Sequence, residues 1–132
     1  MLSSCKVVTS NNGKLDGLWQ VTTMVNLQTG EVIDGRDVGK GLNWAFQGDL
    51  LMMRGEKELV FRFEHAGETL KVHKPYLSGR YTETADDSPI TDASQLNVYG
   101  IYKLEEYFKI LQLTSDDMQL ESANVRLTFR KY

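Results

Sequence analysis

The chain has little of several residue types that would point to particular classes of protein. Cys5 is the only cysteine among 132 residues, so no internal disulfide and no cysteine-based metal site can form. No apolar run approaches the ~18 residues that a transmembrane helix needs. The formal net charge of −3 lacks the basic excess of nucleic-acid-binding proteins, so we expect no nucleic-acid partner.

What is present is an ordinary globular composition. Hydrophobic residues make up 41% of the chain and charged residues 25%, which argues against disorder, and the length is typical of one domain. Residues 1–14 lack periodicity and end in a turn-rich Ser-Asn-Asn-Gly. We therefore expect a flexible tether over residues 1–14 and one folded domain over residues 15–132.

Hydrophobicity at every second position predicts short strands along most of the chain. In the first strand it places five side chains on one face: Trp19, Val21, Thr23, Val25 and Leu27. Residues 28–30 form a tight turn that returns the chain through residues 32–33. A further hairpin over Gly48 and Asp49 sets Phe46 opposite Leu51 and Trp44 opposite Met53.

The region after residue 84 has fewer strand signals. A helical turn is expected within residues 91–98, capped by Asp or Ser, before a strand over residues 107–113. The whole pattern amounts to about eight strands joined by tight turns. We predict an all-β protein, a single antiparallel up-and-down β-barrel with at most one short helix, because an open meander would leave two bare edges.

Two motifs link the first strand to the last. Gly17-Leu18-Trp19 opens the first strand, and Arg126 and Arg130 lie on the last. Here the sequence resembles lipocalin-like calycin barrels, which carry Gly-x-Trp on the first strand and a basic residue on the last. The resemblance implies that Trp19 plugs the closed end and that Arg126 or Arg130 lies over its indole, a cation–π contact worth ~0.5–2 kcal/mol.

The chain is most similar to one group within these barrels. Over residues 15–132 it resembles a small lipocalin-like family of secreted bacterial proteins, known chiefly from gut Bacteroidetes and without assigned function. The segments that carry the resemblance are Leu-x-Gly-x-Trp at residues 15–19, Phe-Gln-Gly-Asp-Leu at 46–50, Tyr-Gly-Ile at 99–101 and Leu-Thr-Phe-Arg-Lys-Tyr at 127–132.

The residues Leu2-Ser3-Ser4-Cys5 resemble the bacterial lipobox. The resemblance implies that Cys5 is acylated and that the protein is anchored in the bacterial cell envelope, on a periplasmic or outer-membrane face, with no other membrane contact. No charged and apolar signal segment precedes the motif, so we expect the natural precursor to begin further upstream. The alternative is a chance match in a cytosolic barrel.

Aromatic residues gather on the inward face of the predicted barrel. An eight-stranded barrel is either filled by its side chains or holds one small ligand. A small apolar ligand would contact Trp44, Phe46, Met53, Phe61 and Phe63, with His65 in phase at the mouth, while His73 faces solvent. The alternative is a filled interior and a protein partner that binds the loops at residues 36–41 and 84–97.

No pattern of catalytic residues is present. The sequence has no Gly-x-Ser-x-Gly, no Cys–His pairing and no phosphate-binding glycine loop, and Glu105 and Glu106 point to opposite sides of a strand. His65 and His73 are out of phase, and the acids between residues 83 and 92 match no calcium loop. We expect no enzyme activity, no cofactor and no metal.

Overall fold

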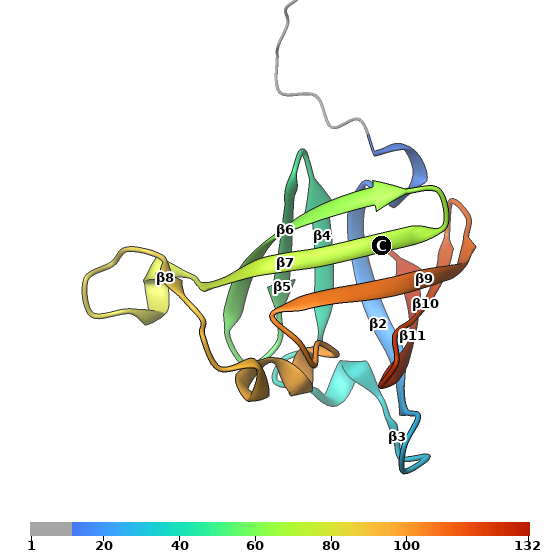
Figure 1. Cartoon of the computed structure of the whole chain (residues 1–132), viewed down its shortest axis with the longest axis horizontal. Coiled ribbons are helices and arrows are strands. Elements are labelled where there is room, and N and C mark those ends of the chain that lie inside the picture. Colours follow the sequence, from blue (N-terminus) through green and yellow to red (C-terminus); the bar gives the residue numbers. More distant parts are fainter. Residues whose placement is uncertain (1–11) are drawn as a thin grey trace, which may run out of the picture.

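Eight antiparallel strands form a closed barrel (Figure 1). The structure is a computed structural model and describes residues 12–132. The strands follow one another around the wall in chain order, and the last pairs with the first, as predicted. The barrel strands are β2 (Gly17–Asn26), β4 (Asn43–Gln47), β5 (Leu50–Arg54), β6 (Glu58–Ala66), β7 (Thr69–Leu77), β9 (Glu105–Leu113), β10 (Asp117–Glu121) and β11 (Val125–Lys131).

Short elements outside the barrel wall complete the fold. Two-residue strands pair at the flank of β2 and of β7, and four 3-10 helices lie at the barrel ends and in the connections. These elements are β3 (Val32–Ile33), β8 (Ser88–Pro89), η1 (Gly13–Leu15), η2 (Gly35–Asp37), η3 (Gly79–Tyr81) and η4 (Ala93–Tyr99).

The two hairpins expected from turn chemistry are confirmed. Phe46 pairs with Leu51 and Trp44 with Met53 across a turn in which Gly48 has a φ of +61°. This left-handed conformation suits glycine and matches the right-handed twist of the strands. After the turn at residues 28–30, β3 pairs back onto β2.

The first strand differs from prediction past its midpoint. The register between β2 and β11 shifts at Thr22, so the inward face continues at Met24 instead of Thr23 and Val25. The Thr22 hydroxyl donates a hydrogen bond to the Thr128 carbonyl at 3.1 Å. An extra residue in one strand reverses the alternation beyond it, and this bulge depends on the partner strand.

A 3-10 helix closes the lower mouth of the barrel. The predicted helical turn forms η4, whose first N–H groups are capped by Asp92 and which ends at Gly100, with a φ of +91°. Its Tyr99 is buried; the Tyr99 hydroxyl accepts a hydrogen bond from Lys57 N at 2.8 Å. Burial raises the pKa of the Tyr99 hydroxyl above its usual value.

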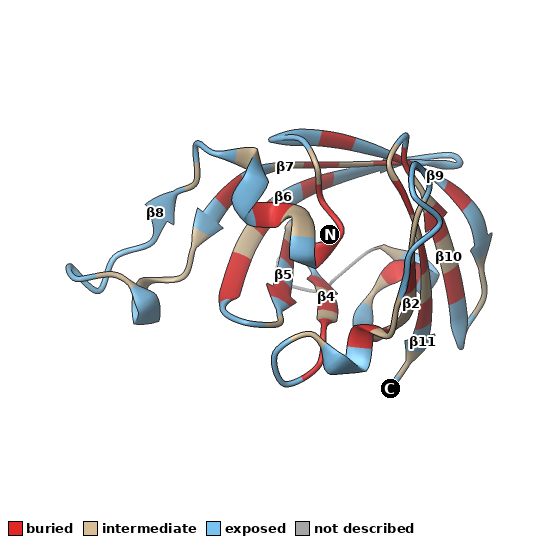
Figure 2. Ribbon diagram, turned by 90° about the horizontal axis from the view of Figure 1, so that it is seen from below, coloured by how far each residue is buried: buried red, intermediate tan, exposed pale blue. Residues whose placement is uncertain are grey.

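Two joints in the wall are built differently. We call the β2–β11 pairing the closing seam; β11 is paired there over its whole length. We call the β7–β9 pairing the split seam, because it extends only from Thr69 to His73 on β7. Beyond that point β7 pairs with β8, and residues 78–92, which we call the arm, project away from the barrel (Figures 1 and 2).

Candidate functional site

The first strand closes one end of the barrel with Trp19. Its indole is fully buried, and its Nε1 donates a hydrogen bond to the Leu15 carbonyl at 2.9 Å. The ammonium of Lys131 lies 4.7 Å from the ring centroid, within the range of a cation–π contact. Lys131 Nζ also donates to the Lys14 carbonyl at 3.1 Å. The predicted burial of Trp19 is confirmed, with Lys131 as its cation.

The prediction that Arg126 or Arg130 lies over the indole is wrong. Arg126 faces outward, where its guanidinium pairs with the Glu121 carboxylate at 2.6 Å, and Arg130 is exposed. Lys131 can reach the ring because Gly17 has no side chain, and a Cβ there would stand 3.0 Å from Lys131 Cε. The glycine of the motif therefore makes room for the cation.

Aromatic rings fill the interior of the barrel. Trp44 on β4 packs edge-on against Phe129 of β11 and Phe108 of β9, with ring centroids 5.0 and 5.7 Å away. In the closed order of strands, β4 and β9 stand on opposite walls. Because the Trp44 ring touches a ring from the opposite wall, no open channel passes between them.

The aromatic residues and the methionine predicted to contact a ligand all lie in this core, whereas His65 does not. Trp44 and Met53 expose none of their surface, and Phe63, the most exposed of the set, exposes 7%. The full set is Trp44, Phe46, Met53, Phe61 and Phe63. A side chain that lines a water-filled cup exposes surface, so this packing does not support their assignment as ligand contacts.

Trp44 and Glu106 each place a polar group inside the barrel. Trp44 Nε1 is buried and has no hydrogen-bond partner among the described residues. The buried Glu106 carboxylate accepts a hydrogen bond from Tyr102 N at 2.9 Å and so fixes the link that follows η4. The alternation that turns Phe108 inward also turns Glu106 inward, so the sequence contained this signal. An unpaired buried donor is rare and usually marks a place for water or a ligand acceptor.

His65 pairs with the buried Leu70 on the inward face of the β6–β7 pair, so its position agrees with the expected place near the barrel mouth and not within the enclosed core. His65 is exposed near the end of β6, where its Nε2 lies 2.9 Å from the Gly67 carbonyl of the hairpin turn. The alternation of inward and outward side chains along β6 continues beyond Phe63, the last residue of the strand that is buried in the core. His73 faces outward as predicted, but its side chain is only 14% exposed, and its Nε2 lies 3.4 Å from the Glu64 carboxylate.

The two loops predicted to bind a partner differ in how closely they pack against the rest of the barrel. In residues 36–41, Gly39 has a φ of +57° and packs so closely that a Cβ would meet the Gly55 carbonyl. In residues 84–97, the second half belongs to η4, and Leu96 is buried. Only the first half of that loop is free, as part of the arm.

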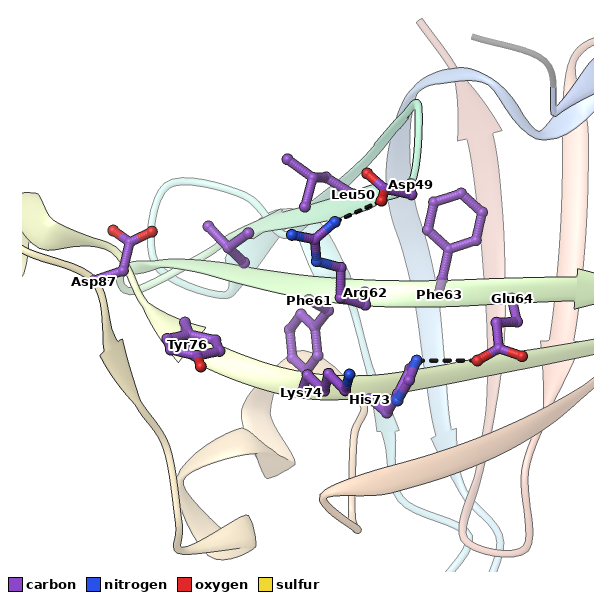
Figure 3. A pocket seen from close by; sticks show the side chains of 11 residues that line it. Asp49, Leu50, Phe61, Arg62, Phe63, Glu64, His73, Lys74, Tyr76 and Asp87 are labelled. Atoms are coloured by element: carbon purple, nitrogen blue, oxygen red, sulfur yellow. Dashed lines mark hydrogen bonds and ion pairs between the residues drawn. The ribbon is translucent and has the colours of Figure 1, made fainter.

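A groove of about 770 Å³ lies on the outside of the barrel beside the arm (Figure 3). Outward-facing side chains of β5, β6 and β7 form most of its lining, joined by one residue from a turn and one from the arm. They are Leu50, Val60, Arg62, Glu64, His73, Lys74, Tyr76, Asp49 and Asp87, with Phe61 and Phe63 also bordering the groove. Sequence reasoning did not find this place.

A β-bulge shapes the groove. The register between β6 and β7 slips after Val60, where one residue of β6 faces both Lys74 and Pro75. Lys74 has a φ of +54°, a left-handed conformation that is uncommon for a residue other than glycine. The alternation breaks there, so that Lys74 and Tyr76 both reach the outer face. This bulge depends on how β6 pairs with β7, so it could not be predicted from the residues of β7 alone.

Ion pairs neutralise part of the groove. Arg62 lies 2.6 Å from the Asp49 carboxylate, and His73 pairs with Glu64 (Figure 3). Lys74 makes no ion pair with any residue from 12 to 132. Within that same range no three metal-ligating side chains converge. The groove therefore offers an unpaired cation beside apolar side chains, an arrangement suited to binding.

One further structural property concerns membranes. In the part of the chain that the structure describes, no helix combines the length and apolar character needed to cross a bilayer.

Comparison with known proteins gives a consistent result. A family model described as a lipocalin-like domain matches residues 1–132. A crystal structure of a lipocalin-like protein from Bacteroides uniformis is 16% identical, with a TM-score of 0.64 over 91% of this chain and 100% of that one. An uncharacterized protein from Bacteroides eggerthii is 17% identical, with a TM-score of 0.61 over 89% and 99% of the two chains. No curated protein matches the sequence.

Proposed function

Because the chain belongs to the family of lipocalin-like domains, we propose that it is a non-catalytic binding protein whose partner docks on the outside of the barrel. The observation that supports this most directly is the contact of Trp44 with Phe108 from the opposite wall, which fills the interior. Surface for a partner is present on the groove side, where the arm and the bulge at Lys74 leave side chains exposed.

The test is a search for an interior ligand. Protein purified from its own cells is measured by native mass spectrometry, before and after denaturation, and titrated with the dye 1-anilinonaphthalene-8-sulfonate. We expect that denaturation releases no bound molecule, and that the dye enhancement of the parent protein stays well below that of a variant with an opened interior. The variant Trp44→Ala serves as positive control, because removing a large buried ring opens an apolar cavity that a small molecule can enter. An apolar molecule that copurifies and is released on denaturation contradicts the proposal.

A second candidate function is the binding of a small, mainly apolar ligand inside the barrel. The observation that favours it is the unpaired Trp44 Nε1, which a ligand carbonyl or hydroxyl would satisfy. Such a ligand has to displace rings that now touch. If this function is right, the copurified molecule is lost from Trp44→Phe, which keeps an aromatic ring and removes the donor.

We also propose that the protein is a lipid-anchored component of the bacterial envelope. Cys5 lies outside the described residues, so the support is the Leu-Ser-Ser-Cys motif and the polar residues after it. One acyl chain binds membranes only marginally, so stable anchoring needs several chains on Cys5. The gene is expressed with its natural upstream sequence and labelled with an alkyne fatty acid. Cys5→Ala should lose the label and the membrane fraction, whereas Ser4→Ala should keep both.

A further inference from the structure

A row of apolar side chains crosses the outside of the barrel from β2 to β8. Cross-strand pairing sets its members side by side on successive strands, and Leu18, Met52 and Tyr76 are the exposed large ones. The row consists of Leu18, Ala45, Met52, Val60, Tyr76 and Pro89. With neighbouring strands ~4.8 Å apart, the row is about 24 Å long. The solvent face of an antiparallel sheet is ordinarily polar, so a continuous apolar row is unusual.

Arginines lie along one side of the middle of this row. Arg54 Nη2 is 3.2 Å and Arg80 Nε 3.7 Å from the carboxylate of Glu58. The Glu58 side chain is 8% exposed, whereas those of Arg54 and Arg80 are 60% and 64% exposed. A single buried carboxylate thus lies beneath two guanidiniums, so the charge that a partner meets on this side is positive.

Another cationic side chain, that of Lys74, lies on the opposite side of the row from the two arginines. Lys74 lies two residues before Tyr76 on β7, whereas Arg80 follows Tyr76. The left-handed backbone of Lys74 turns its side chain to the outside of the barrel, where it lines the groove. Arg62 lies on the same side but is neutralised by Asp49 at 2.6 Å. Apolar side chains therefore occur together with an excess of positive charge on both sides, one charge from the two arginines over Glu58 and one from Lys74, in a chain whose net charge is −3.

We propose that this face, the row from Met52 through Val60 to Tyr76 with Arg54, Arg80 and Lys74 beside it, binds an acidic polypeptide segment that carries apolar side chains. This deepens the proposed function and rests on it. Carboxylates of the segment pair with the exposed cations, and its apolar side chains cover the row. An extended segment of about seven residues spans the 24 Å of the full row from Leu18 to Pro89, and the three row residues of the proposed face, with their cations, lie in its middle and toward β7.

Charge and dimensions decide in favour of a polypeptide. The cations lie on both sides of an apolar row, which requires a ligand that alternates charge and apolar surface over its length. A nucleic-acid backbone is charged at every nucleotide and has no apolar side chains to cover the row. The acidic residues of the arm, Glu83, Asp86 and Asp87, repel phosphates and carboxylates alike, so they do not distinguish the two partners. Asp87 is held at the end of the groove, where its carboxylate accepts a hydrogen bond from Gly79 N at 2.8 Å.

The probe is a fluorescein-labelled peptide of about nine residues in which glutamate alternates with leucine, measured by fluorescence anisotropy at low salt. The matched peptide has glutamine in place of glutamate. The test variant is Met52→Ser with Lys74→Gln, which removes an exposed apolar group and the unpaired cation and leaves Glu58 with its arginines. The matched control is Leu111→Ser with Lys109→Gln, an exposed pair of the same chemistry on β9.

We expect saturable binding of the acidic peptide, at least about tenfold weaker binding of the glutamine peptide, and a similar loss in the Met52/Lys74 variant only; tenfold corresponds to roughly 1.4 kcal/mol. Equal affinity for the two peptides, or equal loss in the control variant, overturns the proposal. So does sedimentation of the protein with phosphatidylglycerol vesicles without peptide binding, because the face then meets a membrane. An interior ligand seen by native mass spectrometry instead contradicts the proposed function, whatever the peptide does.

Discussion

The closing seam and the split seam join the same kind of strands with opposite results. Along the closing seam, β11 pairs with β2 over its full length, and Phe129 packs against Trp19 and Trp44 beneath it. Along the split seam, β7 leaves β9 after His73, and the bulge at Lys74 turns side chains outward. The residues of the first joint pack in the core, whereas the second joint leaves side chains exposed.

This difference separates the part of the barrel that holds the core from the part that leaves side chains exposed. On the closing side, every inward-facing side chain packs in the core, because an eight-stranded barrel with a filled interior has room only for its own side chains. The connection after β7 carries little of the core, so a projecting arm and a strained backbone are tolerated there. Substitutions on the two sides should therefore have different consequences, and the following experiments test this from the largest effect to the smallest.

The largest effect is expected at the plug of the closing side. Trp19→Ala should lower the free energy of unfolding by ~3–5 kcal/mol, because a large buried ring is lost and a cavity remains. Urea denaturation followed by circular dichroism measures the change. The control is Tyr107→Ala, an exposed aromatic next to the split seam, which should change stability by less than about 0.5 kcal/mol. A Trp19→Ala protein that melts within about two degrees of the parent refutes the assignment of Trp19 as a plug.

The next effect compares two glycines that face backbone carbonyls. A Cβ at Gly35 would meet the Val21 carbonyl on β2, and a Cβ at Gly79 would meet the Ala85 carbonyl within the arm. Gly35→Ala should cost ~1–3 kcal/mol of global stability through overpacking. Gly79→Ala should leave the urea midpoint unchanged and speed proteolysis of the arm. Equal changes in the urea midpoint would falsify the independence of the two sides.

A smaller effect is expected from the acid that holds the arm. Glu58→Gln removes the charge shared by Arg54 and Arg80 and should lower stability by ~1 kcal/mol while raising hydrogen exchange in residues 78–92. On the closing side, Glu121→Gln breaks only the more exposed pair with Arg126. Solvent screens that pair, so we expect less than about 0.5 kcal/mol and no change in the arm.

The smallest effect concerns two capping aspartates, one on each side. The side chain and backbone N–H of Arg36 donate to the Asp34 carboxylate and lower its pKa from 3.8 to about 2. For Asp92 the hydrogen bonds come from the hydroxyl and backbone N–H of Ser94, which also lower the pKa of that carboxyl. Both contributions to stability are present above the unfolded pKa and are lost as the pH falls through the folded pKa.

Carbon-detected NMR titration between pH 5 and about pH 1.5 measures both groups. We expect Asp34 to protonate last as the pH falls, and Arg36→Gln to raise the pKa of Asp34 toward its usual value of 3.8 while Asp92 stays unchanged. If the Asp34 titration is insensitive to the Arg36 substitution, the Arg36 side chain is not what lowers the pKa of Asp34.

The sequence predicted what depends on local chemistry. The β4–β5 hairpin followed from alternation around Gly48 and Asp49, and η4 followed from the helical turn expected within residues 91–98 with an Asp or Ser cap. It also predicted barrel closure and a buried Trp19. It did not predict that Met24 replaces Thr23 on the inward face, because the bulge there depends on β11.

The candidate site was less accessible to sequence analysis for the same reason. Lys74 reaches the outer groove only because β6 and β7 pair out of step, and strand phase alone could not show that the enclosed core on β6 ends at Phe63, before His65. The cation over Trp19 is on the last strand as the resemblance implied, but the space beside Gly17 selects Lys131. Local patterns predict elements, whereas the residues exposed to a partner depend on how the strands meet.

Because the first and last strands close the barrel, β2 cannot form its closing pair until β11 has been synthesised. Thr22 and Thr128, which hydrogen-bond across the closing seam, are 106 residues apart. At a synthesis rate of about 5–20 residues per second, β2 waits roughly 5–20 s before its partner exists. During that time one backbone edge of β2 is bare and Trp19 has no cover. The nascent chain is therefore most open to aggregation, and to chaperone binding, at the strand that later closes the barrel.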